Sequence, residues 1–276
     1  MRLATVRVPS GTAAVRLEPT GAIHLGASDV GALLADPDWR ERAASAAGER
    51  FPATDLDFAP VVPRPEKIVC VGLNYRKHIE EMGHELPAYP TLFAKYPPAL
   101  IGANDDIVLA GGSEAMDFEA ELAVVIGASA RHADQRAARA AIAGYTILND
   151  VTARDWQSRT LQWLQGKSFE DTTPLGPALV TPDEVDAEAG LAISCAIGGE
   201  VMQSDDTGQL LFGPVELVAY ISEFVTLRPG DVIATGTPAG VGHGRTPPRY
   251  LRDDEVLVTT IDGLGECRNR CRQERR

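Results

Sequence analysis

Residues 117–126 constrain this chain more than any other segment, because alternating acidic residues lead directly into an unbroken apolar run. Asp117, Glu119 and Glu121 are separated by single residues, and side chains two positions apart lie on the same face of a β-strand. A strand here predicts three adjacent carboxylates. Their repulsion requires a cation, and a hard divalent ion such as Mg²⁺ or Mn²⁺ accepts such oxygen ligands. The alternative is an edge strand whose charges oppose aggregation.

A second predicted strand favours the metal site over the edge strand. Residues 145–148 are largely apolar and are followed by Asn149 and Asp150, so another carboxylate stands at a strand end. Residues 152–157 then add a dense polar cluster that includes Arg154 and Gln157. We interpret the two segments as parts of one binding site.

The charge balance excludes several classes of partner. The chain of 276 residues has 26 basic and 39 acidic residues, a formal charge of -13, which argues against nucleic acid and anionic membrane surfaces. No apolar run is long enough to span a bilayer, and residues 1–8 are typical of a strand and not of a signal peptide. The glycine-rich run 236–244 lacks the Gly-Lys-Ser/Thr of a nucleotide-binding loop. We expect a cytoplasmic protein.

The four cysteines fit that location. Cys70 and Cys195 lie in apolar, strand-like runs, which predicts reduced core residues. Cys267 and Cys271 have no second pair nearby with which to form a zinc site. We expect all four to be structural.

Lysine is rare in this chain, and its few positions are informative. Only Lys67, Lys77, Lys95 and Lys167 occur, against 22 arginines. Arginine is the usual cation here, so a lysine inside a motif indicates a need for a compact, titratable ammonium. Chance placement accounts equally well for Lys67 and Lys77, whereas Lys167 follows Gly166 within a motif and is predicted to be functional.

The pattern of strands and helices predicts two parts. Residues 1–60 predict a small N-terminal α/β domain, a proline-rich stretch at 59–65 predicts a linker, and residues 66–272 form a larger domain. Strands and helices do not alternate regularly in the larger part, which favours an α+β, strand-rich architecture. The strands are predicted at 67–71, 91–95, 117–126, 145–149, 175–180, 191–197, 231–234 and 255–261, and the helices at 75–82, 134–143, 153–165 and 215–224.

A second group of candidate residues lies on the first of these helices. Asn74 can cap the helix, which places His78 and Glu81 three residues apart on one face. A carboxylate beside an imidazole orients the ring, which suits a general base. Arg76 and Lys77 stand in the first turn, where the helix dipole disfavours cations, as expected of a lid over an anionic substrate. A surface histidine with solvated charges is the alternative.

The order of five motifs resembles the fumarylacetoacetate hydrolase superfamily, over roughly residues 66–272. The motifs occupy residues 72–78, 117–121, 149–155, 166–169 and 235–242. The resemblance implies a β-sandwich roll around the active site, a homodimer, and one Mg²⁺ or Mn²⁺ bound by Glu119, Glu121 and Asp150. It assigns His78 and Glu81 to water activation, and Lys167, Arg154, Gln157 and Thr237 to the substrate's oxygens.

The resemblance also implies a reaction on a small 2-oxo acid. We expect a metal-dependent hydrolase that cleaves the carbon–carbon bond of an acylpyruvate or related 2,4-dioxo acid and releases pyruvate, because an oriented base such as His78 suits water activation. A positive group such as Lys167 would stabilise the enolate. The alternatives are a decarboxylase of the oxaloacetate type, an isomerase or hydratase of an unsaturated 2-oxo diacid, and a catalytically silent binding protein.

Overall fold

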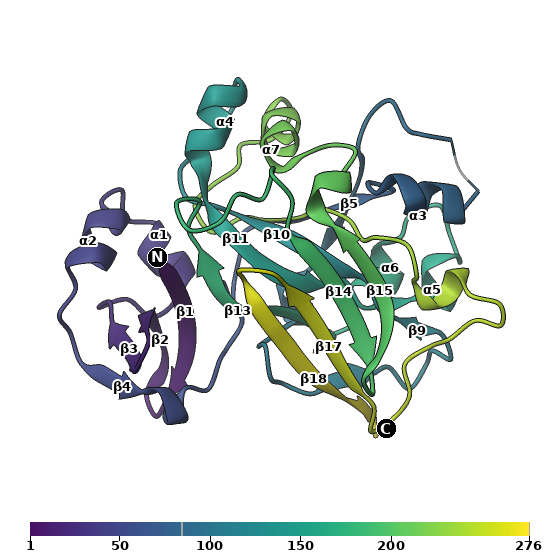
Figure 1. Ribbon diagram of the computed structural model, residues 1–276, viewed down its shortest axis with the longest axis horizontal. Helices are drawn as coiled ribbons and strands as arrows, with labels where there is room; N and C mark the ends of the chain where they lie inside the picture. Colours follow the sequence, from purple (N-terminus) through teal and green to yellow (C-terminus); the bar gives the residue numbers. More distant parts are fainter. Residues whose placement is uncertain (84, 276) are drawn as a thin grey trace.

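The computed structural model describes residues 1–83 and 85–275, and its main feature is two β-sheets packed against each other (Figure 1). Strands outnumber helices in these residues, and most of the helices are short. The predicted strand-rich α+β class is confirmed. No helix of the described residues is long and apolar enough to cross a membrane.

The larger sheet has eleven strands and runs through the whole molecule. Across the sheet the order is β4 (Arg50–Pro52), β3 (Gly21–His24), β2 (Gly11–Glu18), β1 (Arg2–Val8), β13 (Thr173–Val180), β11 (Ile142–Asn149), β10 (Ala120–Ile126), β16 (Val232–Ala234), β5 (Ile68–Gly72) and β6 (Thr91–Lys95), with β7 (Leu100–Ile101) beside β13. Every residue of the central strands β10 and β11 is buried, as their nearly continuous apolar sequences require. The two strands pair antiparallel, with Ala120 opposite Asn149.

The smaller sheet covers one face of β10 and β11. Its order is β15 (Glu200–Asp206), β14 (Ala192–Ile197), β17 (Val256–Ile261), β18 (Gly265–Gln273) and β8 (Ile107–Leu109). Gly198 and Gly199 form the hairpin turn between β14 and β15, with φ angles of 58° and 91°, as a Gly-Gly pair between two strands favours. Leu122 and Val124 of β10 pack against Leu257 of β17 in the main core between the sheets. Glu121 therefore points to the opposite face of the larger sheet, because adjacent side chains alternate.

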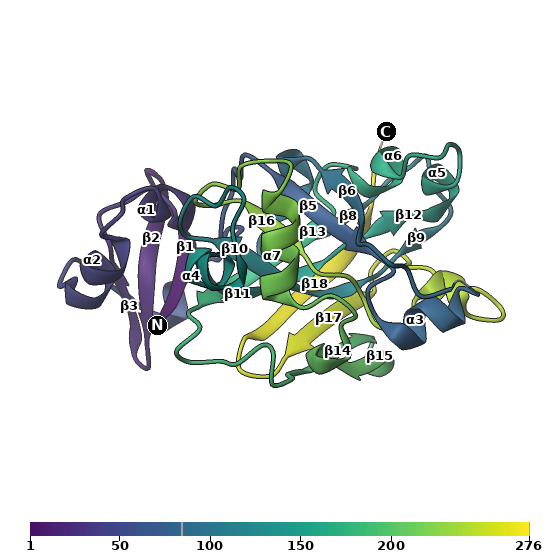
Figure 2. The same cartoon turned by 90° about the horizontal axis from the view of Figure 1, so that it is seen from above.

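The helices lie outside the two sheets. They are α1 (Val30–Leu34), α2 (Trp39–Ser45), α3 (Arg76–Glu81), α4 (Gln135–Ala141), α5 (Arg154–Gln157), α6 (Leu164–Lys167) and α7 (Pro214–Ser222), with short 3-10 turns η1 (Ala53–Asp55), η2 (Pro97–Ala99), η3 (Thr207–Gln209) and η4 (Gly242–Gly244). Helices α3, α5 and α6 lie at the end of the molecule opposite β1 to β4 (Figure 2).

Two predictions about helices were wrong. Asn74 does not cap α3, because its side-chain amide donates to the carbonyl oxygens of Phe212 (3.0 Å) and Thr235 (2.8 Å), and the helix begins two residues later. The single helix predicted at 153–165 is divided into α5 and α6. Gly166 lies so close to the backbone of Gln157 that a side chain would not fit, and its absence allows α6 to fold back onto α5.

The N-terminal part joins the larger sheet directly. Strand β1 pairs antiparallel with β13, with Leu3 opposite Leu179. Leu3 also packs with Val125 of β10 in a second core cluster. The boundary between two domains near residue 60 stays a prediction. The hydrogen bonds of the larger sheet connect the residues on its two sides.

Candidate functional site

A pocket of about 340 Å³ opens beside α3, α5 and α6. Its walls come from the end of β5, the start of β10, the segment from α5 to α6, and the glycine-rich loop that contains Thr237 and His243. Its lining combines charged side chains with Phe93, Trp163 and other apolar side chains. Segments distant in sequence therefore meet at a single pocket.

Three buried carboxylates converge beside the pocket. Glu119, Glu121 and Asp150 each offer an oxygen atom, and these atoms lie within 4.8 Å of one another. The pairing of β10 with β11 brings them together, because Asp150 directly follows the residue opposite Ala120. The Asp150 backbone N–H also donates to the Glu119 carbonyl oxygen at 2.8 Å. The antiparallel register thus brings together the three acids that the family resemblance implied.

Asp117 does not belong to this group, and the strand predicted from 117 to 126 is interrupted. Strand β9 (Met116–Asp117) pairs with β12 (Thr152–Ala153), and β10 starts only at Ala120. The Asn149 side chain accepts the Glu119 N–H at 3.0 Å, which replaces a bond of the regular ladder. The predicted common face of three carboxylates is therefore correct for Glu119 and Glu121 only.

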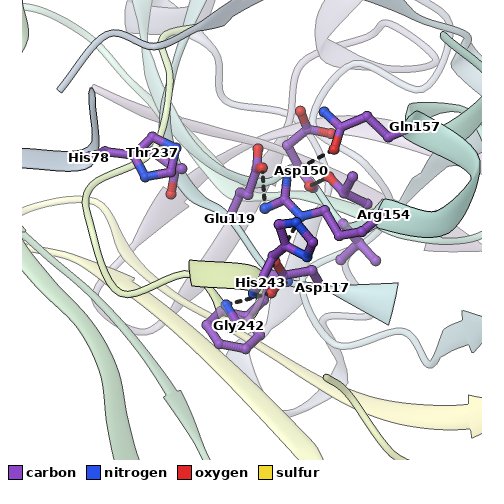
Figure 3. A network of polar contacts seen from close by, with 12 residues as sticks. His78, Asp117, Glu119, Asp150, Arg154, Gln157, Thr237, Gly242 and His243 are labelled. Carbon is purple, nitrogen blue, oxygen red and sulfur yellow. Dashed lines mark hydrogen bonds and ion pairs between the residues drawn. The ribbon is translucent and has the colours of Figure 1, made fainter. Parts of the chain in front are cut away.

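Asp117 instead organises the backbone and Arg154. Its carboxylate accepts four hydrogen bonds: from the backbone N–H groups of Phe118 (2.8 Å), Gly242 (2.7 Å) and His243 (2.9 Å), and from Arg154 Nε (2.8 Å). Figure 3 shows Arg154 between Asp117, Glu119 and Gln157. Asp117 thus holds both the arginine and the glycine-rich loop in place.

Two lysines and one arginine surround the acidic group. Lys167 Nζ donates to Glu119 Oε2 at 2.7 Å and to Asp150 Oδ2 at 2.8 Å. Lys95 Nζ donates to Asp150 Oδ1 at 2.6 Å. The Arg154 guanidinium forms an ion pair with Glu119 at 2.7 Å. Glu121 accepts the Gly236 N–H at 2.7 Å and forms no ion pair with any described residue.

These contacts set the charge of the acidic residues. Burial raises the pKa of Glu121 well above its usual value, and repulsion from Asp150 and Glu119 adds to the effect. Burial also opposes ionisation of Glu119, but Lys167 and Arg154 prevail and lower its pKa to about 2. Of the three acids, Glu121 is the one without an ion pair among the described residues. Three buried oxygen donors with one uncompensated carboxylate fit a hard divalent cation.

His78 and Glu81 are in contact beside the same pocket, as their spacing predicted. His78 Nδ1 and Glu81 Oε2 lie 3.1 Å apart. The Gly240 N–H also donates to both Glu81 oxygens, at 3.1 and 3.2 Å. Burial tends to raise the pKa of Glu81, but the contacts with His78 and Gly240 outweigh it and lower the pKa. An ionised carboxylate thus orients the imidazole.

The other predicted substrate-binding residues differ in position. Gln157 lines the pocket, and its carbonyl oxygen accepts a hydrogen bond from Arg154 at 3.1 Å. Thr237 lines the pocket too, but its hydroxyl donates to the Ala120 carbonyl oxygen at 2.9 Å. Arg76 is exposed on α3 and does not line the pocket. The roles of these residues stay predictions.

Sequence reasoning missed three residues that support the site. Lys95 bonds to Asp150, Gln203 donates to Thr237 at 2.8 Å and accepts the Ala120 N–H at 3.0 Å, and His243 lines the pocket. The scarcity of lysine could have pointed to Lys95. Nothing in its surroundings singles out Gln203, which reaches the site from the smaller sheet.

Comparisons with known proteins agree with this geometry. Residues 67–272 match the family described as "Fumarylacetoacetate (FAA) hydrolase C-terminal". The chain is 45% identical over 217 residues to human mitochondrial oxaloacetate tautomerase FAHD2A, covering 78% of this chain and 69% of the relative. The rat oxaloacetate tautomerase Fahd2a is 43% identical over 225 residues, which cover 81% of this chain and 72% of the relative.

Solved structures give the same result. A putative HpcE protein from Mycobacterium smegmatis superposes with a TM-score of 0.92 at 32% identity, and all of both chains is covered. Maleylpyruvate hydrolase from Sphingobium, solved with manganese(II) and pyruvate, superposes with a TM-score of 0.83 at 27% identity, again over all of both chains. The match over residues 67–272, the fold and the tautomerase relatives together establish that this chain belongs to the fumarylacetoacetate hydrolase family.

Proposed function

We propose that this protein interconverts the keto and enol forms of a 2-oxo dicarboxylic acid of the oxaloacetate type, with Mg²⁺ or Mn²⁺ held by Glu119, Glu121 and Asp150. The observation that carries the proposal is the presence of an oriented imidazole, His78, and a buried ammonium, Lys167, in the walls of one pocket. The names of the relatives that share 43–45% of their aligned residues support the same reaction.

The base in this reaction is His78. Its Nδ1 faces the ionised Glu81 and carries the proton of that contact, so Nε2 is left to accept a proton. A substrate bound in the pocket would lose a proton from C3 to Nε2 and become an enolate, and the enolate oxygen would then take a proton from the imidazolium or from water to give the enol; the reverse direction retraces these steps. Glu81 stabilises the imidazolium formed between these two steps.

Other residues of the pocket wall stabilise the developing enolate. Lys167 Nζ is held between Glu119 and Asp150 and is placed to donate a hydrogen bond to the enolate oxygen. The Gln157 carbonyl is engaged by Arg154, which leaves its amide N–H groups for a substrate oxygen. A divalent ion in the site would polarise the 2-oxo group and so make the C3 proton more acidic.

A second candidate is hydrolysis of an acylpyruvate, to which the sequence pointed. The observation in its favour is the fixed His78–Glu81 pair, which Gly240 supports from the backbone, because a base that is held so firmly can also deprotonate water. The structural neighbour named maleylpyruvate hydrolase supports this alternative.

A tautomerisation assay tests the first proposal. Enol oxaloacetate absorbs in the ultraviolet, so its decay can be followed with the protein plus Mn²⁺, with EDTA, and with His78→Ala. We expect acceleration that EDTA removes and that His78→Ala strongly reduces. Equal decay with and without the wild-type protein would contradict the proposal.

Labelled water separates the alternatives. Cleavage of an acylpyruvate in H₂¹⁸O places solvent oxygen in the carboxylate of the product that is not pyruvate, whereas tautomerisation forms no such product. Release of CO₂ from oxaloacetate would indicate decarboxylation. The homodimer and the cytoplasmic location stay predictions, and a sedimentation measurement tests the former.

A further inference from the structure

Lys95 is a buried cation whose role neither the motifs nor the pocket explains. It ends the edge strand β6, and its side chain is fully buried, as is that of Asp150. Its Nζ donates to Asp150 Oδ1 at 2.6 Å and to the Val151 carbonyl oxygen at 3.2 Å. Burying an ammonium group costs free energy unless the group is paired. The contacts with Asp150 and Val151 therefore account for the lysine at this position.

The two lysines that contact Asp150 are placed differently. Lys167 contacts Oδ2 at 2.8 Å and lines the pocket, where substrate and solvent can reach it. Lys95 contacts the other oxygen and does not line the pocket. The two oxygens of the Asp150 carboxylate thus have different partners: Lys95, away from the pocket, holds Oδ1, and Lys167, at the pocket wall, holds Oδ2.

We propose that Lys95 is a positioning residue for the metal site: it holds Asp150 Oδ1 and thereby presents Oδ2 toward Glu119 and Glu121. The inference rests on the metal site proposed above. Groups that orient a metal ligand in this way contribute substantially to affinity, and their loss typically weakens binding 10- to 100-fold.

A purely electrostatic role predicts the opposite result. A positive charge next to the site repels a divalent cation, so removal of the Lys95 charge alone would tighten binding. Positioning and repulsion therefore change the dissociation constant in opposite directions, and one titration distinguishes them.

The test is calorimetric titration of the metal-stripped protein with MnCl₂. We expect Lys95→Met to weaken Mn²⁺ binding by about 10- to 100-fold. Lys95→Gln should lose less, because its amide can still donate to Asp150. Unchanged or tighter binding by Lys95→Met would overturn the inference.

Two further variants complete the design. Lys67→Met is the matched control, because Lys67 also pairs with a buried carboxylate, that of Asp231 at 2.9 Å, but outside the pocket; its Mn²⁺ affinity should equal that of the wild type. If Lys95→Met does not fold, the double variant Lys95→Met/Asp150→Asn removes both charges and is compared with Asp150→Asn. Equal affinity supports action through Asp150, and a further loss refutes it. A wild-type protein that binds no Mn²⁺ would overturn the metal site itself and this inference with it.

Discussion

Asp117 and Glu121 are both fully buried acids close together in the sequence, but the structure predicts opposite effects of neutralising them. Asp117→Asn keeps the size of the side chain and replaces one oxygen by an NH₂ group. Oδ1 accepts from Phe118 and Gly242, and Oδ2 accepts from His243 and Arg154. Whichever of the two oxygens becomes the NH₂ group, the two donors that bonded to that oxygen lose their acceptor and face N–H donors instead.

The size of the effect follows from those two donors. A buried polar group left without a partner costs about 1–3 kcal/mol, and a broken buried ion pair about 3–5 kcal/mol. Arg154 keeps its contact with Glu119, which moderates the loss. We therefore expect Asp117→Asn to lower the free energy of unfolding by about 3–5 kcal/mol.

Glu121→Gln should behave differently. Glu121 has one hydrogen bond, from Gly236, and burial together with Asp150 and Glu119 disfavours its charge. In the absence of divalent ions Gln should leave the free energy of unfolding unchanged or raise it, because it replaces a group whose ionised form the surroundings disfavour. The same variant should lose most of its affinity for Mn²⁺.

Urea denaturation in EDTA, followed by the fluorescence of the three tryptophans, measures both variants. If the slope of the unfolding free energy against urea concentration is the same for a variant and the wild type, a shift of the midpoint reports a change in stability and not a change in the unfolded state. A loss below about 1 kcal/mol for Asp117→Asn, the net worth of a single typical hydrogen bond, would refute the reasoning. A large loss for Glu121→Gln in EDTA would refute the assignment of this residue to a cation.

Three other predictions concern the pocket. Gly166→Ala would place a Cβ atom 2.4 Å from the backbone nitrogen of Gln157, so α5 and α6 must separate. Thermal melting should show a free energy of unfolding lower by about 1–3 kcal/mol, and the activity should fall. Lys167→Arg should fold, as judged by circular dichroism, and lose kcat strongly, because a planar guanidinium cannot replace an ammonium held at 2.7 and 2.8 Å; turnover like that of the wild type would contradict this. His78→Ala should lower kcat by about 10²- to 10⁴-fold with a smaller change in KM, Glu81→Gln should be milder, and the reverse order would argue against His78 as the base.

Much of the site could be predicted from sequence because its chemistry is local. The alternation of Glu119 and Glu121 follows from the period of a strand, and the contact of His78 with Glu81 follows from the spacing of a helix. The strand-rich class and the hairpin at Gly198 likewise reflect short-range patterns. The family motifs extended this by naming Asp150 as the third acid.

The tertiary structure decided which charges meet across long distances in sequence. Asp117 follows the same alternation as Glu119, yet its partners Gly242 and His243 come from a loop more than a hundred residues away, and they draw it out of the acidic group. Lys95, at the end of the edge strand β6, contacts Asp150, which follows β11, although β5, β16 and β10 stand between these two strands in the order of the larger sheet. Side-chain periodicity is a property of a few neighbouring residues, whereas the pairing of buried charges depends on how strands are ordered in the sheet, and that order is set by the packing of the whole core.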